Sequence, residues 1–425
     1  MHMTVIPSKL SGVVSAPPSK SLTHRAFILG MLADGTTTIK SPLISDDTIS
    51  TMKAVEAFGA KIDKNEDGYI IHPNNLSIPD KEIDVGNSGT TLRLMCGIAS
   101  LLDGTTTFSG DESISKRPIA PLLKALNQLG ASCKSVGKNG SPPVVVRGVI
   151  NKEHTEIRGD ICSQFISSLL ISCPLKSTDT TIELNSRLVS PSYVALTMDM
   201  LDKFNVKVET NDDNDKFFIK KNQIYKGIQH KIPGDYSSAS YIMVGAAITG
   251  SEVTINNLDP HSIQGDRAIL DILQEAGAEV NINGSSTTIK GGNLQGVEVD
   301  CSDIPDLFPI LAVLGAYSKG KTRLYKATHV KYKESNRLET TANMIRSLGA
   351  EIDISEEGIM ISGGRVLEGG IINPEGDHRI FMAGVIAALA ASKPSRVIGP
   401  LCHGISYPDF IKDIKSLGAN VEEGQ

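Results

Sequence analysis

One short pattern recurs six times along this 425-residue sequence and constrains its fold more than any other feature. In each copy a helical stretch runs into a glycine or an asparagine, the residues that best tolerate the left-handed conformation ending many helices. Alternating, strand-like residues then follow. The copies are centred on Gly59, Gly130, Asn205, Gly277, Gly349 and Gly418. They lie about seventy residues apart, which is long enough for a unit of helices and strands. The sequence therefore predicts six repeats of mixed α/β (α+β) structure.

Upstream of each of these positions, a polar cluster precedes an apolar helical run. The clusters span residues 19–21, 87–90, 162–164, 237–239, 303–306 and 377–379. A single cluster of this kind is most simply an N-cap, in which a side-chain oxygen accepts a hydrogen bond from a backbone amide. Six clusters in register favour another interpretation, because helix starts that face one opening combine free amides with the positive ends of their dipoles. We expect such an opening to bind anions.

Basic side chains accompany the clusters and indicate which anions bind. They are Lys20, Arg25, Arg117, Lys333, Arg337 and Arg379, all in short polar segments. Each one alone is most simply a surface charge or half of a salt bridge. As a set they suit phosphates and carboxylates, whose oxygens match the planar fork of arginine. The sequence contains neither a GxxxxGK[ST] nucleotide loop nor a GxSxG nucleophile motif.

Composition and charge limit the partners and the cellular environment that this chain can have. The formal net charge of −6 disfavours nucleic acid or an anionic membrane as the main partner. The six cysteines form no CxxC pair and no cluster with metal-ligand spacing, so we expect no metal site and a reduced, cytoplasmic environment. The start lacks an apolar signal core, and the most apolar run, residues 381–391, is too short to cross a bilayer.

Seven ordered motifs resemble those of the enolpyruvyl transferase family, most closely its members that act on shikimate 3-phosphate. They are PSKS at 18–21, GNSGT at 86–90, KRPI at 116–119, SQF at 163–165, IPD at 304–306, KESNRL at 333–338 and DHR at 377–379. The resemblance covers essentially the whole chain. It implies a two-domain, inside-out α/β barrel fold in which each domain holds three βαβαββ repeats. We expect one domain at 14–227, a second at 1–13 plus 228–425, and the active site in the cleft between them.

The resemblance also implies a reaction. The carboxyvinyl group of phosphoenolpyruvate is transferred to the 5-hydroxyl of shikimate 3-phosphate, and phosphate is released without a metal or organic cofactor. Such an addition and elimination needs a base for the hydroxyl proton and an acid for the methylene carbon. By motif match, Lys20, Asp306 and Glu334 are the expected catalytic residues. Asp306 is expected to contact the hydroxyl, and the division of the other proton transfers stays open.

Expected substrate ligands follow from the same motif matches. For shikimate 3-phosphate they are Lys20, Ser21, Arg25, Ser163, Gln164, Ser190, Tyr193, Asp306 and Lys333. For phosphoenolpyruvate they are Lys20, Gly89, Arg117, Gln164, Arg337 and Arg379, with His378 as support. In this family, the herbicide glyphosate competes for the phosphoenolpyruvate site, which is bordered by the glycine equivalent to Gly89. We therefore predict inhibition here, a weaker effect in Gly89→Ala, and a monomeric protein.

Three positions depart from the family pattern. Cys162 replaces the usual Ser or Thr before the Ser-Gln pair, and a thiol is a weaker donor to phosphate. His329 replaces an Asn near the expected shikimate site, where it is a supporting residue. Ile405 stands where many relatives have a Lys that binds phosphoenolpyruvate. We therefore expect activity with a weaker hold on that substrate.

Two alternatives stay open at this point. A related transferase acts on UDP-N-acetylglucosamine, but it usually carries a reactive Cys near residues 111–117, where this chain has Ser113 and Ser115. A noncatalytic anion-binding relative is the second alternative. The presence of Lys20, Asp306 and Glu334 argues against it.

Overall fold

A computed structural model describes residues 2–424 of the chain, which divide into two compact units. Unit 1 combines Met1–Pro17 with Pro233–Gln425, and unit 2 is Pro18–Ile232. Both crossings lie a few residues later than the sequence suggested. The reason is that strands β2 (Ser11–Ser15) and β14 (Gln229–Lys231) pair along their whole length, in unit 1 and unit 2 respectively, before the chain crosses.

Each unit contains three four-stranded sheets of one topology, in which a parallel pair is extended by two antiparallel strands. The sheets of unit 2 are β14-β3-β5-β4, β6-β7-β9-β8 and β10-β11-β13-β12. Their strands are β3 (Thr37–Lys40), β4 (Lys61–Lys64), β5 (Gly68–His72), β6 (Ile83–Asp84), β7 (Thr105–Ser109), β8 (Ser132–Ser135), β9 (Val144–Arg147), β10 (His154–Ile157), β11 (Thr180–Leu184), β12 (Val208–Thr210) and β13 (Lys216–Ile219).

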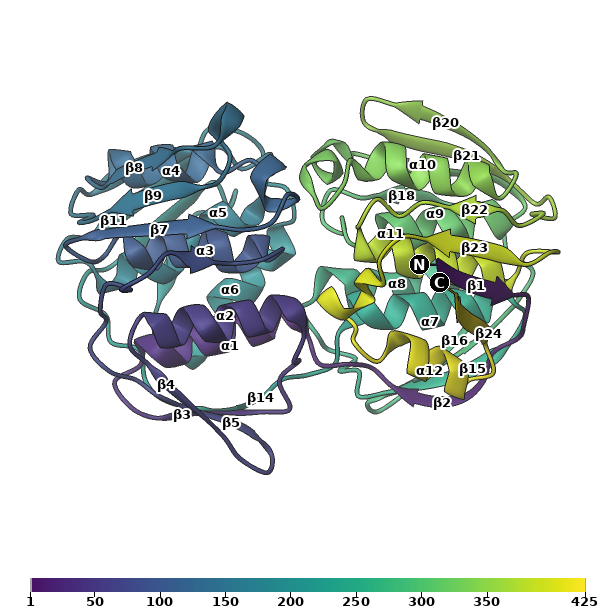
Figure 1. The fold of residues 1–425 in the computed structure, drawn as a ribbon, viewed down its shortest axis with the longest axis horizontal. Coiled ribbons are helices and arrows are strands. Elements are labelled where there is room, and N and C mark those ends of the chain that lie inside the picture. The colour runs from purple at the N-terminus through teal and green to yellow at the C-terminus, as the bar shows by residue number, and fades with distance from the viewer. Residues whose placement is uncertain (1, 425) are drawn as a thin grey trace. The chain divides into compact units, whose positions relative to one another are not determined.

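The sheets of unit 1 are β16-β17-β15-β2, β18-β19-β21-β20 and β22-β23-β1-β24. Their strands are β1 (His2–Ile6), β15 (Glu252–Asn256), β16 (Glu279–Asn283), β17 (Ser286–Lys290), β18 (Glu298–Asp300), β19 (Gly320–Tyr325), β20 (Glu351–Ser355), β21 (Gly358–Gly363), β22 (Ile371–Ile372), β23 (Ser395–Ile398) and β24 (Asn420–Gly424). The chain ends meet in the last sheet, where β1 pairs antiparallel with β24 (Figure 1).

Two helices accompany each sheet. Those of unit 2 are α1 (Lys20–Leu32), α2 (Asp46–Ala57), α3 (Gly89–Ala99), α4 (Ala120–Gln128), α5 (Ser163–Ser172) and α6 (Pro191–Lys203). Those of unit 1 are α7 (Tyr236–Ile248), α8 (Ile269–Glu275), α9 (Phe308–Tyr317), α10 (Arg337–Ser347), α11 (His378–Leu389) and α12 (Phe410–Ser416). The first helix of each pair is buried almost throughout, which its apolar sequence requires.

The predicted helix ends are confirmed at all six repeats. Gly59, Gly130, Gly277, Gly349 and Gly418 have φ between 93° and 114°, and Asn205 has φ 65°. These residues follow the C-caps of α2, α4, α6, α8, α10 and α12, so the repeated pattern marks the end of the second helix of each pair.

The polar clusters also lie at helix starts. Ser19, Ser88 and Asp377 cap α1, α3 and α11 by accepting a hydrogen bond from a backbone amide of the first turn. The cluster at 303–306 precedes α9 by a short turn.

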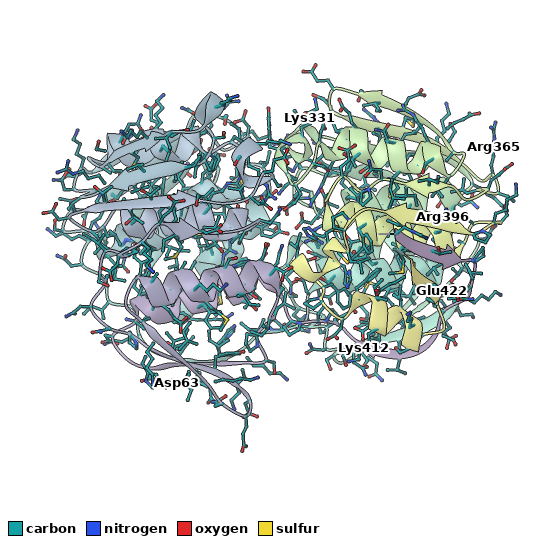
Figure 2. All side chains as sticks on the ribbon, viewed as in Figure 1. Asp63, Lys331, Arg365, Arg396, Lys412 and Glu422 are labelled. Carbon is teal, nitrogen blue, oxygen red and sulfur yellow. The ribbon has the colours of Figure 1, made fainter. Side chains whose placement is uncertain are left out.

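In several strands, exposed polar residues alternate with buried residues. In β23, for example, Arg396 is exposed between the buried Ser395 and Val397. Figure 2 shows the Arg396 side chain on β23 and the Glu422 side chain on β24. Four cations of the predicted site, Arg25, Arg117, Arg337 and Arg379, are instead buried.

Candidate active site

Lys20, the first residue of α1, is the predicted catalytic base or acid of unit 2. Its Nζ donates to Oδ2 of Asp47 at 2.8 Å, and the two side chains are 13% and 5% exposed. Asp47 lies in the first turn of α2, and Ser45 and Thr48 form a capping box at the start of this helix. A mostly buried ion pair of this kind is held in one geometry by its surroundings. The sequence analysis missed Asp47, although the capping box signals the helix start that positions it.

Arg25 lies one turn further along α1 and is 2% exposed. Its Nη1 donates to the carbonyl of Ser21 at 2.9 Å, and its Nη2 donates to the carbonyl of Tyr193 at 3.2 Å. Its Nε donates to Oγ1 of Thr197 at 2.8 Å. Burial lowers the pKa of Arg25 to about 10, which still leaves it charged at neutral pH. The structure thus brings together three residues predicted to bind shikimate 3-phosphate, Arg25, Ser21 and Tyr193.

Two arginines converge at the start of α3. Arg117 donates from Nη2 to Oδ1 of Asn87 at 2.7 Å and to Oγ of Ser113 at 3.0 Å. A Cβ placed on Gly89 would lie 2.9 Å from Nη1 of Arg117 and 2.9 Å from Nη1 of Arg93. The first amides of a helix and two guanidinium groups therefore meet at a residue with no side chain. This arrangement is suited to a small anion.

Gln164, the second residue of α5, is held by residues of α3. Its Oε1 accepts from Nη1 of Arg93 at 2.7 Å, and its Nε2 donates to Oγ1 of Thr90 at 2.8 Å. These bonds fix which end of the amide is oxygen and which is nitrogen. Thr90 is the last residue of the GNSGT motif, and the sequence predicted no role for Thr90 or Arg93. The structure shows that they orient Gln164.

The starts of α5 and α6 carry the predicted phosphate ligands. Ser163 is the first residue of α5 and is 5% exposed. Its predecessor Cys162 forms no side-chain cap, and its Sγ lies 3.8 Å from Oε1 of Gln164. Ser190 precedes α6 in a left-handed conformation, with φ 52°, that is costly for a residue with a side chain. Such strain at a helix start is typical of a functional position.

In unit 1, Arg337 is the centre of a carboxylate cluster and is 1% exposed. Its Nη1 donates to Oδ1 of Asp306 at 2.9 Å. Its Nη2 donates to Oε2 of Glu334 at 2.5 Å, and its Nε donates to Oδ2 of Asp377 at 2.8 Å. Both predicted catalytic carboxylates of this unit are therefore oriented by one guanidinium. Sequence reasoning assigned Arg337 to phosphoenolpyruvate alone and missed this role.

Asp306 also accepts from Arg379, whose Nη2 lies 2.7 Å from its Oδ2. Burial acts to raise the pKa of this carboxyl, but the nearby positive charges, of which Arg379 is the largest, outweigh burial. The pKa of Asp306 is therefore held well below its ordinary value, and the residue is ionised at neutral pH. It is a carboxylate within a ring of cations.

The remaining predicted residues of unit 1 surround this cluster. His329 is buried in a 3₁₀ turn (Thr328–Tyr332), and its burial and the charge of Lys333 lower its pKa to about 3, so the ring is neutral. Lys333 follows this turn and is partly buried. His378 begins α11 directly after the Asp377 cap and is buried. Ile405 is 8% exposed and belongs to the apolar core of unit 1, so it adds no charge to the site.

Among residues 2–424, no group of three or more His, Cys, Asp or Glu side chains is arranged to hold a metal ion. Within the same range, the helices are all too short or too polar to cross a membrane.

The site combines buried helix starts, carboxylates and converging arginines. These features are typical of a class of enzyme that binds small anions and transfers protons to or from them. The particular family follows from comparison with known proteins. The chain matches the family model described as EPSP synthase (3-phosphoshikimate 1-carboxyvinyltransferase) over residues 5–414, and it belongs to that family.

Individual relatives agree with this assignment. The chain is 45% identical over 422 residues to a 3-phosphoshikimate 1-carboxyvinyltransferase of Methanocella arvoryzae, covering 98% of each protein. It is 43% identical over 426 residues to the protein of the same name from Methanocorpusculum labreanum, covering 100% of each. The fold is similar to that of EPSP synthase from Acinetobacter baumannii, with a TM-score of 0.82, 28% identity and full coverage of both chains. The predicted family and the two-domain α/β fold are confirmed.

Proposed function

We propose that this enzyme transfers the carboxyvinyl group of phosphoenolpyruvate to the 5-hydroxyl of shikimate 3-phosphate, in the shikimate pathway that leads to chorismate and the aromatic amino acids. The cluster of Asp306, Glu334 and Arg337 carries the proposal, because it places an ionised base and a second carboxyl on one buried cation. Membership of the EPSP synthase family supplies the two substrates. This activity corresponds to that named for its curated relatives.

The chemistry divides into addition and elimination. In the addition, Asp306 takes the proton of the 5-hydroxyl, and the oxygen of that hydroxyl bonds to carbon 2 of phosphoenolpyruvate. An acid protonates the methylene carbon. In the elimination, the new methyl group loses a proton and the bond to phosphate breaks, which restores the double bond and releases inorganic phosphate. Lys20 and Glu334 are the pair proposed for the methylene carbon and the departing phosphate. Positioned groups of this kind accelerate proton transfer by about 10²–10⁴-fold each.

Binding of shikimate 3-phosphate follows the geometry of its proposed ligands. Arg25, with the backbone of Ser21 and Tyr193 fixed against it, is proposed to bind the carboxylate. The hydroxyls of Ser163 and Ser190 at two helix starts, together with Lys333, are proposed to bind the phosphate. Lys333 and Asp306 belong to unit 1, whereas Arg25 and the two serines belong to unit 2.

Phosphoenolpyruvate is proposed to bind at the start of α3. Its anionic groups would meet the backbone at Gly89 and the guanidinium of Arg117 in unit 2, with Arg379 and Arg337 contributed by unit 1. Gln164, held by Arg93, is proposed to lie against both substrates. Glyphosate is proposed to compete at the same anion site. A cytoplasmic monomer remains the expected form of the enzyme.

The direct test is phosphate release from phosphoenolpyruvate in the presence of either of two acceptors. The proposal predicts release with shikimate 3-phosphate and none with UDP-N-acetylglucosamine. Release with the nucleotide sugar alone would assign the chain to the related transferase. Absence of release with both acceptors would leave a noncatalytic anion-binding protein.

A further inference from the structure

The start of α7 carries a capping carboxyl, and a second carboxyl, from a neighbouring turn of unit 1, bonds to its first turn. Asp235 caps the helix by accepting from the amide of Ser238 at 3.1 Å. The hydroxyl of Ser237, in the first turn, makes a short hydrogen bond to Oδ2 of Asp266. Asp266 comes from a 3₁₀ turn (Gly265–Ala268) that precedes α8, and its side chain is 2% exposed. The fourth helix start therefore receives an internal carboxyl.

The surroundings of Asp266 are unfavourable for a negative charge. Its Oδ1 is buried and has no hydrogen-bond partner among the described residues. Two other carboxyls, Asp306 and Asp235, face it, and Arg379 of α11 is the opposing cation. The neighbouring Arg267 donates its Nε to the carbonyl of Pro260 at 2.6 Å. A buried carboxylate with one hydrogen bond and two like-charged neighbours is costly.

Tyr241 of α7 is the remaining titratable group at this point. Its hydroxyl is buried and interacts with Arg379 and with the charge of Asp306. Burial, followed by the charge of Asp306, raises the pKa of Asp266 to about 7, while Arg379 and the Ser237 hydroxyl act in the opposite direction. Burial thus favours the neutral acid, and the protonated and ionised forms of Asp266 interconvert near neutral pH.

Asp266 and Asp306 form a pair whose environments separate their protonation states. Asp306 makes hydrogen bonds to two arginines, whereas Asp266 makes none to a cation. Of two interacting carboxyls in unequal environments, the one that lacks a cation partner keeps its proton to higher pH. Asp306 is then the ionised member of the two, and the charge of Arg379 is directed to Asp306 and to the proposed phosphoenolpyruvate site.

We infer that Asp266 is a positioning residue of the reaction: in its protonated form it leaves the charge of Arg379 to Asp306 and phosphoenolpyruvate, and its ionisation withdraws that charge. The inference rests on the proposed function. An acid is protonated below its pKa and ionised above it, so the added negative charge develops as pH rises. Binding of anionic phosphoenolpyruvate therefore weakens as pH rises, and the KM for this substrate increases.

The test compares the wild type with Asp266→Asn, which keeps the shape of the protonated side chain and cannot ionise. KM for phosphoenolpyruvate and kcat are measured from pH 6 to pH 9 by phosphate release. Division of the wild-type KM by the variant KM at each pH cancels the titration of the substrate and of all other groups. The expected ratio increases by about tenfold across this range. A tenfold change corresponds to a difference of about one unit in the pKa of Asp266 between the free enzyme and the enzyme with phosphoenolpyruvate bound. Asp271→Asn, at an exposed position of α8, is the matched control and should follow the wild type.

A second variant covers the case in which Asp266→Asn is poorly folded. Ser237→Ala removes a hydrogen bond that favours the ionised carboxylate, so the pH at which KM begins to increase should move upward. A ratio that stays constant within about twofold from pH 6 to pH 9, or a downward movement in Ser237→Ala, would overturn the inference. Wild-type enzyme that releases no phosphate at any pH would instead refute the proposed function.

Discussion

Gly89→Ala tests the anion site at the start of α3. Gly89 has an ordinary helical backbone, so alanine introduces no backbone strain, and its higher helix propensity favours the fold by up to about 1 kcal/mol. The added Cβ would lie 2.9 Å from a terminal nitrogen of both Arg93 and Arg117, closer than a carbon can approach. These atoms end flexible side chains, so the guanidinium groups move and the helix stays in place.

The expected magnitude follows from the bonds that such a movement removes. Displacement of Arg117 by a few tenths of an ångström or more weakens one charge-assisted hydrogen bond to the bound anion, which is worth about 1.5–3 kcal/mol. That energy corresponds to an increase of roughly 10-fold to 100-fold in the KM for phosphoenolpyruvate. Inhibition by glyphosate should weaken by a similar or larger factor, because the inhibitor is proposed to occupy the same space.

The assay measures both KM values and the glyphosate inhibition constant by phosphate release, alongside thermal unfolding. KM for shikimate 3-phosphate and the unfolding midpoint should change little. Gly35→Ala is the matched control, because no atom lies within 4 Å of its added Cβ. Unchanged KM for phosphoenolpyruvate together with unchanged glyphosate inhibition would refute the placement of the anion at Gly89.

Three other substitutions test separate parts of the account. Arg337→Ala leaves its carboxylate partners without their shared cation and should lower the free energy of unfolding by about 3–5 kcal/mol, measured by urea denaturation; a change below about 1 kcal/mol would contradict the central role of this arginine. Lys20→Met should lower kcat by about 10²–10⁴-fold while the exposed control Lys64→Met stays at the wild-type rate, and equal rates in the two variants would exclude Lys20 from proton transfer. Ser163→Ala should increase the KM for shikimate 3-phosphate by about tenfold and that for phosphoenolpyruvate much less, since one hydrogen bond to a charged phosphate is lost; the opposite pattern would move Ser163 to the other substrate.

The repeat could be predicted from the sequence because its signal is local. A glycine or asparagine that ends a helix must adopt positive φ, and Asn205 does so at the one repeat that lacks glycine. The pairing of β2 with β15 and of β14 with β3 has no local signal, because each pair joins segments far apart in the chain. This is why the crossings between units were placed a few residues too early.

The candidate site shows the same limit. Motifs identified Asp306 and Arg379, but their mutual hydrogen bond depends on two separate repeats packing together. Asp47 and Asp266 were missed because an aspartate near a helix start is indistinguishable, in sequence, from an ordinary cap. Their importance arises from burial and from the charge that each one faces. Such properties exist only in the folded chain.

The central claim concerns which hydroxyl receives the carboxyvinyl group. The most direct measurement is a proton NMR spectrum of the product formed from shikimate 3-phosphate and phosphoenolpyruvate, recorded together with the amount of phosphate released. The account predicts two new vinyl proton signals on an ether linked to the 5-position, in a one-to-one ratio with phosphate. Phosphate release without vinyl ether signals, or a vinyl ether formed only with UDP-N-acetylglucosamine, would contradict it.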